Sequence, residues 1–392
     1  MKVPPLASAI AEKIAKNKKG LVLVLVVVVV VVVVVVSLAA LSSRPGHGPH
    51  GPHNGPTGPR NGPHNGPRNG PTDLHDEESR IFVSVASYRD KLCGATLASM
   101  FAMARNPARV FAGVYEQNAD DSESCVGGNL GPGAARCDEA SKWRSNVRLV
   151  TVGAEQAKGP CAARYRCSLL LRDEPVFLQI DSHTEFARDW DVGAVRMLRE
   201  VPGARQGKVV ISTYPVNCDT GWESSGIPVI DKAKYSGGWV TFEATIRGTV
   251  DGAVDGPDGT PGVPSRQIGG GFMLCVADVV RRVPFDPGLD GVFNNEEALY
   301  TARLFTHGID VVAPRRNLVC HNYFYQEHRV PWNDRPDWNK DTRGNERVDS
   351  LLLGKNEDQF GKYGMGTARS LSDFWAHVNI DYAHKTVGAW PH

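Results

Sequence analysis

The chain has 392 residues, and its 44 Lys and Arg residues nearly balance its 43 Asp and Glu residues. This balance, together with the lack of a basic helix with interleaved aromatic residues, gives no reason to expect nucleic acid as a partner. When an N-terminal part of unusual composition is set aside, residues 80–392 have the length of one large enzyme domain.

The first predicted element is a membrane-spanning helix over residues 21–41. Residues 21–36 are all Leu or Val, and the whole segment would span about 31 Å, the thickness of a bilayer core. A backbone in lipid must satisfy its own hydrogen bonds, so a helix is expected. The positive-inside rule predicts that the lysine-rich residues 1–20 form a cytoplasmic tail, because only Arg44 follows the segment closely. A cleaved signal peptide, with small side chains at residues 37–39, is the alternative.

Residues 42–79 are predicted to form an extended stem. Between residues 45 and 72 the sequence repeats Gly-Pro followed by His, Arg or Thr, and inserted Asn residues break the period that a collagen helix requires. Such a segment has too few apolar residues to bury a core. It would hold the following domain away from the membrane.

Eight cysteines follow the membrane segment. A translocated domain would expose them to an oxidising compartment, and the even count allows up to four disulfides. The sequence does not determine their pairing. No Cys-x-x-Cys pair occurs, which disfavours both a structural zinc site and a redox role.

Strand-like and helix-like segments alternate from residue 80 onward. This alternation is typical of an α/β fold with a mostly parallel sheet covered by helices. Strands are predicted at residues 81–86, 110–115, 147–152, 176–180, 209–211, 240–246, 272–276 and 317–320, and helices at 92–104, 160–172 and 296–306. Residues 250–264, rich in Gly, Asp and Pro, are predicted to form a loop.

One pair of residues indicates a metal site. The strand at 176–180 runs directly into Asp181, and His183 follows two residues later. Ligands of open α/β sheets bind beyond the carboxyl ends of the strands, and residues i and i+2 of an extended chain point to the same side. Asp181 and His183 can therefore face one ion, and this pair suits Mn²⁺ better than Ca²⁺. His321 is the best candidate for a third ligand, because it too ends an apolar strand. In the alternative interpretation Asp181 caps a turn and His183 is an ordinary polar residue.

Seven segments, in order along the chain, carry a resemblance to a known family. They are Ile81–Asp90 (IFVSVASYRD), Lys158–Arg164 (KGPCAAR), Phe177–His183 (FLQIDSH), Val283–Pro287 (VPFDP), Glu296–Glu297, Ala302–Gly308 (ARLFTHG) and Gly364–Leu371 (GMGTARSL). Together they resemble the GlcNAc-transferase family that includes protein-hydroxyproline and mucin-type polypeptide α-GlcNAc-transferases. The chain is similar, more distantly, to the polypeptide GalNAc-transferases. The resemblance implies a GT-A glycosyltransferase fold, a UDP-sugar donor and a retaining transfer that produces an α-linked sugar.

The resemblance also implies how the donor and its metal are bound. It makes Asp181, His183 and His321 the ligands of Mn²⁺ or Mg²⁺. A metal is physically reasonable, because cleavage of the sugar–phosphate bond leaves a diphosphate whose negative charge must be stabilised.

Further donor contacts are implied at the end of the first strand and on a helix. The resemblance places Ser87, Tyr88 and Arg89 near the uridine. Arg164 would approach the diphosphate, where its guanidinium offers a planar fork to paired oxygens. The alternative for Arg164 is a solvated helix residue.

Two adjacent acids complete the catalytic centre that the resemblance implies. Glu296 and Glu297 would face the hydroxyls of the transferred sugar, since carboxylates accept hydrogen bonds from paired hydroxyls. Two acids in a first helical turn are also favoured by the helix dipole alone. Family members tend to have Gly immediately before the acids, whereas this chain has Asn294 and Asn295. Asn tolerates left-handed backbone better than most residues, so the turn is expected to survive.

These inferences predict a single-pass type II membrane protein of the Golgi with a luminal glycosyltransferase domain. Its expected reaction moves GlcNAc from UDP-GlcNAc to a Ser, Thr or hydroxyproline hydroxyl of a secretory-pathway protein. Transfer from another UDP-sugar such as UDP-GalNAc, a silent lectin-like or scaffold protein, and a metal-dependent hydrolase are the alternatives.

Overall fold

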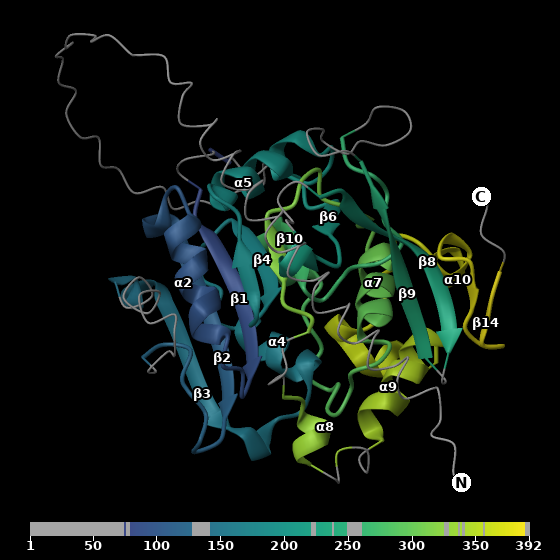
Figure 1. The fold of residues 1–392 in the computed structure, drawn as a ribbon. Coiled ribbons are helices and arrows are strands. Elements are labelled where there is room, and N and C mark those ends of the chain that lie inside the picture. Colours follow the sequence, from purple (N-terminus) through teal and green to yellow (C-terminus); the bar gives the residue numbers. More distant parts are fainter. Residues whose placement is uncertain are drawn as a thin grey trace, which may run out of the picture. The chain divides into compact units, whose positions relative to one another are not determined.

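The predicted membrane segment, at residues 21–41, and nearly all of the predicted stem lie outside the described residues, as does most of the predicted loop at 250–264. The computed structural model describes residues 74–75, 79–127, 142–220, 225–236, 239–248, 261–324, 329–335, 338, 342–355 and 357–388 (Figure 1). Within those ranges no helix is long and apolar enough to cross a membrane.

A seven-stranded sheet forms the centre of the described domain. The strand order is β11, β6, β10, β4, β1, β2, β3, and only β10 runs antiparallel to its neighbours. The strands are Ile81–Tyr88 (β1), Val110–Asn118 (β2), Val147–Gly153 (β3), Val176–Asp181 (β4), Val209–Ser212 (β6), Phe272–Val276 (β10) and Asp310–Val312 (β11). The expected mixed α/β fold with a mostly parallel sheet is thus confirmed.

The central strands are buried on both faces. Residues 176–180 of β4 and 81–85 of β1 are all buried, which explains their nearly continuous apolar sequences. Helices and strands share one large hydrophobic core that includes Leu97 and Met197. The helices next to the sheet are Cys93–Met103 (α2), Pro160–Ser168 (α4), Trp190–Glu200 (α5) and Ala277–Arg282 (α6).

The helix α4 is shorter than expected. It ends at Ser168 instead of Arg172, and the chain then forms a turn at Leu169 and Leu170. The backbone N–H of Arg172 donates to the carboxylate of Glu174. This side-chain acceptor replaces a helical carbonyl, which is how polar side chains compete with helix continuation.

A second hydrophobic core lies around α7, Glu296–Thr306, whose bounds match the predicted helix. The hairpin of Ile227–Ser236 (β8) and Trp239–Arg247 (β9) contributes to it, as do two further helices, Arg343–Leu352 (α9) and Leu371–His377 (α10). The remaining elements are Thr184–Phe186 (β5), Val216–Asn217 (β7), Val319–His321 (β12), Pro331–Asp334 (α8), Ile380–Asp381 (β13), Thr386–Val387 (β14) and short 3-10 turns at 107–109, 144–146, 154–156, 218–220 and 357–363.

Two disulfides occur among the described residues. Cys93 is bonded to Cys125, and Cys218 is bonded to Cys320. The other described cysteines, Cys161, Cys167 and Cys275, are buried free thiols, and Cys137 lies outside the described ranges. The four bridges that the cysteine count allowed therefore reduce to two in the part of the chain that is described.

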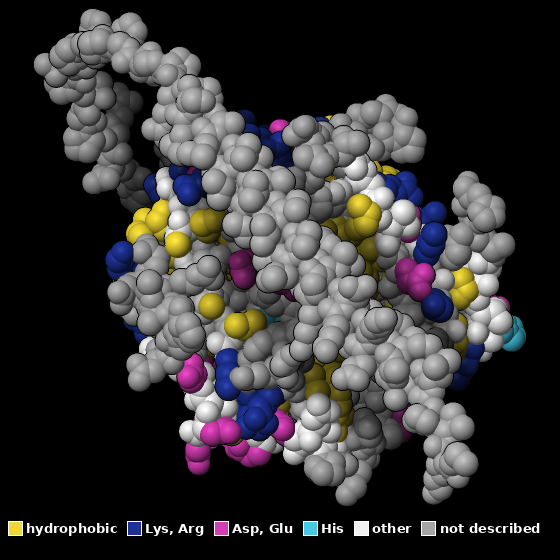
Figure 2. Space-filling view, viewed as in Figure 1, with side chains coloured by type: hydrophobic (Ala, Val, Ile, Leu, Met, Phe, Trp, Pro, Cys, Tyr) yellow, Lys and Arg dark blue, Asp and Glu magenta, His cyan; other side chains and the backbone are white. Residues whose placement is uncertain are grey.

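Charged side chains of both signs are interspersed on the visible surface. Figure 2 shows Lys and Arg side chains next to Asp and Glu side chains on several parts of the described surface. Lys234–Glu243 and Arg282–Asp278 are exposed ion pairs of the described residues. Isolated exposed pairs of this kind contribute little to stability.

Candidate functional site

The carboxyl ends of β1 and β4 meet at one edge of the central sheet. The two strands pair in parallel, with Ala86 beside Asp181, so the residues that follow both strands project from the same edge. The antiparallel strand β10 starts at this edge, with Phe272 beside Ile180, and so brings Gly271 to the end of β4. Three segments far apart in the sequence converge there.

The predicted metal ligands Asp181, His183 and His321 come together at this edge. Their ligand atoms all lie within 4.8 Å of one another. Nε2 of His321 is 3.2 Å from Oδ2 of Asp181, and the two imidazole rings meet edge to face with centroids 4.4 Å apart. Asp181 ends β4 and His321 ends β12, so the packing of two sheets joins residues that are distant in sequence.

The cluster has the chemistry and the space for a divalent cation. One carboxylate and two imidazoles form a donor set that suits Mn²⁺. Burial would raise the pKa of Asp181, but His321 and Arg164 hold that pKa well below its usual range, so the carboxylate is ionised. A side chain at position 271 would intrude, because a Cβ on Gly271 would lie 3.2 Å from Oδ2 of Asp181.

Asp90 orients His183 and was missed by the sequence analysis. Its buried carboxylate lies 2.6 Å from Nδ1 of His183 and accepts a hydrogen bond of 2.6 Å from Ser182 Oγ. Burial would raise the pKa of Asp90, but these contacts lower it. A carboxylate that holds one imidazole nitrogen leaves the other available as a ligand. Asp90 ends the first resemblance segment, yet no local pattern distinguishes it from an ordinary turn residue.

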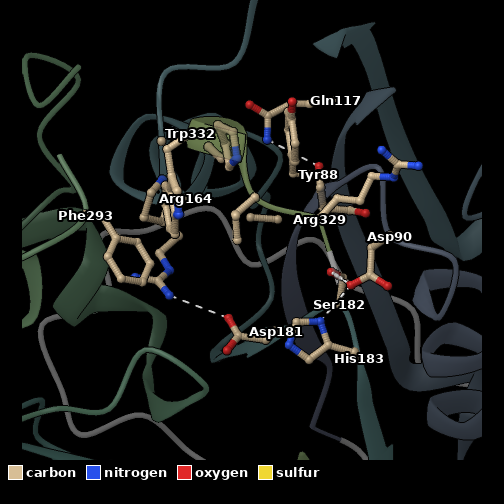
Figure 3. Close-up of a pocket in the computed structure, with 17 residues that line it drawn as sticks. Tyr88, Asp90, Gln117, Arg164, Asp181, Ser182, His183, Phe293, Arg329 and Trp332 are labelled. Atoms are coloured by element: carbon tan, nitrogen blue, oxygen red, sulfur yellow. Dashed lines mark hydrogen bonds and ion pairs between the residues drawn. The ribbon is translucent and has the colours of Figure 1, made fainter. Parts of the chain in front are cut away.

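Arg164 lies beside the triad, in the first turns of α4. Pro160 begins this helix, and Gly159 precedes it with a φ of +96°, which residues with side chains rarely adopt. The guanidinium of Arg164 pairs with Glu296 and lies 3.5 Å from Oδ1 of Asp181 (Figure 3). Since its side chain is only 10% exposed, Arg164 is a buried cation between two carboxylates and not a solvated surface residue.

The turn before α7 survives without glycine. Asn295 has a φ of +62°, in the left-handed region, as the tolerance of Asn for this backbone predicts. Its side-chain oxygen accepts a hydrogen bond of 2.9 Å from the backbone N–H of Val240 in β9. Asn295 therefore supplies both the turn and a tie to the β8–β9 hairpin.

The two acids of α7 have different partners. Glu296 pairs with Arg164. Glu297 accepts hydrogen bonds of 2.6 Å from the Tyr214 hydroxyl and 2.6 Å from the backbone N–H of Gly270. Burial, and secondarily the charge of Glu296, raise the pKa of Glu297 to about 7. The hydroxyl of Tyr214 is a contact that sequence analysis missed, because nothing near Tyr214 in the chain points to α7.

The three residues predicted near the uridine divide between a cavity and its rim. Ser87 and Tyr88 line the cavity, and the buried hydroxyl oxygen of Ser87 has no hydrogen-bond partner among the described residues. The Tyr88 hydroxyl donates to Asp334 at 3.0 Å, while Arg89 pairs with Asp121 and Asp334. Arg89 is not one of the lining residues, and it ties α8 to the end of β1.

Two cavities meet at the triad. One, of about 130 Å³, lies over the end of β1 and is lined on one side by Phe293 and Trp332, whose ring centroids are 4.7 Å apart (Figure 3). The other, of about 490 Å³, lies over the start of α7 and reaches Tyr214 and Tyr323. The residues that line both cavities are Pro160, Arg164, Asp181, His183 and Phe293.

A second group of potential ligands lies nearby but is committed to another bond. Glu185, Cys218 and Cys320 have ligand atoms close together. The two sulfur atoms form a disulfide, so they are not thiolate ligands. Asp181, His183 and His321 are therefore the better candidate among the described residues.

The family comparison covers most of the chain. The family model described as Glycosyltransferase (GlcNAc) matches residues 80–138 and 132–384. None of the curated proteins matches the chain in sequence.

Several solved structures align with the chain at low identity. GalNAc-T7 with UDP, GalNAc and Mn²⁺ is 14% identical, with a TM-score of 0.46 over 76% of this chain and 55% of that protein. TarS residues 1–349 of S. aureus with UDP-GlcNAc is 11% identical, with a TM-score of 0.46 over 76% and 70% of the two chains. The mannosyltransferase PcManGT of Pyrobaculum calidifontis with GDP-Man and Mn²⁺ is 13% identical, with a TM-score of 0.41 over 80% and 74%. The chain thus spans little more than half the length of GalNAc-T7.

Proposed function

This chain belongs to the GlcNAc glycosyltransferase family, and we propose that it is a retaining enzyme with the GT-A fold that transfers GlcNAc from UDP-GlcNAc. We further propose that the acceptor is a Ser, Thr or hydroxyproline hydroxyl of a protein, as in the polypeptide-modifying members that the sequence resembles. The site residues then have defined tasks in binding the donor and stabilising the leaving diphosphate.

The observation that carries this proposal is the meeting of two cavities at the triad. A nucleotide sugar has a nucleoside, a charged diphosphate and a sugar in series. The smaller cavity, with Ser87 and Tyr88, is the proposed nucleoside end, and the larger cavity, with Glu296 and Glu297, is the proposed sugar and acceptor end. Asp181, His183 and Arg164 line both cavities. The diphosphate would lie beside these three residues, between the nucleoside end and the sugar end.

Asp181, His183 and His321 would hold the metal, Mn²⁺ or Mg²⁺. When bound, the ion would stabilise negative charge on the diphosphate oxygens as the sugar leaves. Asp90 would keep His183 oriented for this task. Gly271 would keep the space beside Asp181 open.

Arg164 is the second cationic group in this proposal. Its fork can hold paired phosphate oxygens, and its burial makes each such contact stronger than in water. In the present arrangement Glu296 neutralises Arg164, which removes the cost of an unpaired buried charge. Donor binding would give Arg164 a further anionic partner besides Glu296 and Asp181, and would leave Glu296 available to accept from a sugar hydroxyl.

The cellular setting is part of the same proposal. Residues 1–20 would be a cytoplasmic tail, 21–41 a membrane anchor, 42–79 a stem and 80–392 the luminal domain of a Golgi protein. The lysine-rich tail and apolar run support this arrangement. Two disulfides are also consistent with an oxidising compartment.

Donor turnover by the full-length protein tests the proposed function. UDP release would be measured with Mn²⁺, Mg²⁺ or a chelator, across UDP-GlcNAc, UDP-GalNAc, UDP-Glc and UDP-Gal, with and without Ser/Thr/Pro-rich peptides. We expect metal-dependent release from UDP-GlcNAc that rises when peptide is added, with an α-linked sugar on the product.

Other outcomes would favour the alternatives. Faster turnover of UDP-GalNAc would keep the enzyme class and change the sugar. Tight donor binding without turnover would favour a lectin-like or scaffold protein. Metal-dependent cleavage of substrates that contain no nucleotide sugar would favour a hydrolase.

A further inference from the structure

The two histidines of the triad are held in different ways. His183 is fixed through its ring, since Nδ1 lies 2.6 Å from the buried carboxylate of Asp90. Nδ1 of His321 is also buried, but it has no hydrogen-bond partner among the described residues. The ring of His321 is therefore oriented by its backbone, by ring contacts with His183 and Tyr323, and by the contact of Nε2 with Asp181, the atom pair that a cation would separate.

The backbone of His321 belongs to a short strand. β12 has three residues and lies between β5 and β7 in a small sheet. Its pairing has three positions with β5 and only two with β7, where Cys320 lies beside Val216 and His321 beside Asn217. Strands this short have little stability of their own, so another constraint is needed to keep His321 in place.

A disulfide supplies that constraint at the neighbouring residue. Cys320 is bonded to Cys218, which directly follows β7. Successive side chains of a strand point to opposite faces, so the disulfide lies on the face opposite the imidazole of His321. It can fix the strand without entering the ligand cluster.

We propose that the Cys218–Cys320 disulfide positions His321, so that the protein binds its divalent cation tightly only in the oxidised form. This inference rests on the proposed function in one respect, namely that Asp181, His183 and His321 bind the metal. Cys218 and Cys320 are positioning residues, because they act through the backbone of His321 and do not touch the cation.

The change of state is a thiol–disulfide exchange. An external dithiol reductant gives up two electrons and two protons and becomes a disulfide. The Cys218–Cys320 disulfide accepts them and becomes two thiols. β12 then keeps its hydrogen bonds to β5 and β7 and the core packing of Val319, but it loses the covalent link beside His321, so this imidazole can move away from the cluster. The cytoplasmic thiol pool would favour the reduced form, whereas a secretory compartment would preserve the bond. Metal loading would thus depend on the compartment.

The first experiment measures manganese binding alone, by titration calorimetry on the full-length protein without nucleotide. The C218S/C320S variant should bind Mn²⁺ about 10- to 100-fold more weakly than the parent, the range seen when groups that orient a metal ligand are lost. The matched control is C93S/C125S, which removes the other disulfide and should bind Mn²⁺ as the parent does. Circular dichroism would establish that each protein is folded.

A second experiment needs no substitution at Cys218 or Cys320. The C93S/C125S protein is reduced with dithiothreitol, freed of reductant by gel filtration without oxygen, titrated with Mn²⁺, and then reoxidised. Affinity should fall by the same factor as in C218S/C320S and return after reoxidation. Reductant should have no effect on manganese binding by C218S/C320S itself.

The outcomes separate this inference from the proposed function. Tight binding by the parent, with unchanged affinity in C218S/C320S and after reduction, would overturn the positioning role and leave the proposed enzyme intact. Equal losses in both double variants would also overturn it, because they would reflect general stability. A parent that binds no Mn²⁺ would overturn both the metal site and this inference.

Discussion

The end of β4 and the start of α7 both present carboxylates to the larger cavity, but they hold them in opposite ways. Asp181 is surrounded by groups that carry or can carry positive charge, namely His321 and Arg164, and its pKa is held low. Glu297 is held by neutral donors, Tyr214 and the backbone of Gly270, and its pKa is raised to about 7.

The two carboxylates are therefore suited to different tasks. Asp181 can bind a cation, whereas Glu297 holds neighbouring protein groups in place. Asp181 is ionised, and the imidazoles of His183 and His321 lie next to its carboxylate. A metal ion would replace the contact between His321 and Asp181. The carboxylate of Glu297 already accepts hydrogen bonds from three donors of the protein, Tyr214, Gln267 and the backbone of Gly270. We therefore expect Asp181 to govern metal binding, and Glu297 to act mainly by fixing Tyr214 and the Gly270 backbone around the sugar.

The largest expected effect is at the β4 end. Replacing Asp181 and His183 together by alanine should abolish Mn²⁺ binding and metal-dependent UDP binding, because two of three ligands are lost. Calorimetry on the purified protein would measure both. The control Asp278→Asn changes an exposed acid in α6 and should bind as the parent does. Parent-like affinity in the double variant would remove the basis for the comparison.

Arg164 connects the two regions, and its loss should be the next largest effect. Arg164→Ala should lower kcat/KM about 100-fold, as the loss of a preorganised charge-stabilising group does. It should also destabilise the fold by about 3 kcal/mol, because the carboxylate of Glu296 would remain buried without its partner.

Arg164→Lys is the matched control for that prediction. It keeps the charge, so most of the stability should return, whereas much of the activity loss should remain because the planar fork is gone. Thermal unfolding and steady-state kinetics would separate the two effects. Full activity in Arg164→Lys would show that a point charge is sufficient there.

The α7 side can be tested through the pH dependence of stability. The folded-state pKa of Glu297 is about 7, above the ordinary value of 4.5, so its stabilising contribution is full below pH 4.5 and is lost as the pH rises through about 7. The side chain of Gln does not titrate, so Glu297→Gln should reduce the change in unfolding free energy between pH 4.5 and about 7. The expected reduction is only about 2 kcal/mol, because Glu297 is partly exposed to solvent.

Denaturant titrations at several pH values would measure this slope. The control Glu243→Gln, at an exposed acid of β9, should keep the parent's pH dependence. An unchanged slope in Glu297→Gln would mean that Glu297 is ionised in the folded protein and resembles Asp181 after all.

The smallest effect is expected at Tyr88, which lines the smaller cavity. Tyr88→Phe removes the hydrogen bond to Asp334, a contribution of about 1 kcal/mol. UDP affinity should fall a few-fold, while Mn²⁺ affinity should not change, because Tyr88 touches no ligand of the triad. A large loss of Mn²⁺ binding would show that the nucleotide end and the metal are coupled.

Local sequence patterns predicted the elements of the site well. The apolar run before Asp181 became β4, and the periodic segment that stops before Gly308 became α7 with the expected bounds. The pattern predicted too long a helix at α4, which ends at Ser168. The backbone N–H of Arg172 donates to the carboxylate of Glu174 instead of a helical carbonyl, and helix propensity alone does not reveal this competition. It also missed α5, although buried residues such as Ala194 and Leu198 recur along it at helical spacing.

The sequence by itself identified Asp181 and His183 as candidate ligands, because both follow one buried strand. In the structure β4 ends at Asp181, and the turn at residues 182–183 brings the two side chains together. Only the tertiary structure decided their partners. Asp90 is 93 positions from His183, and His321 is 140 positions from Asp181. The pairing of Cys218 with Cys320 spans 102 positions. Contacts over such separations depend on how strands and helices pack, and no pattern within a single segment encodes that packing.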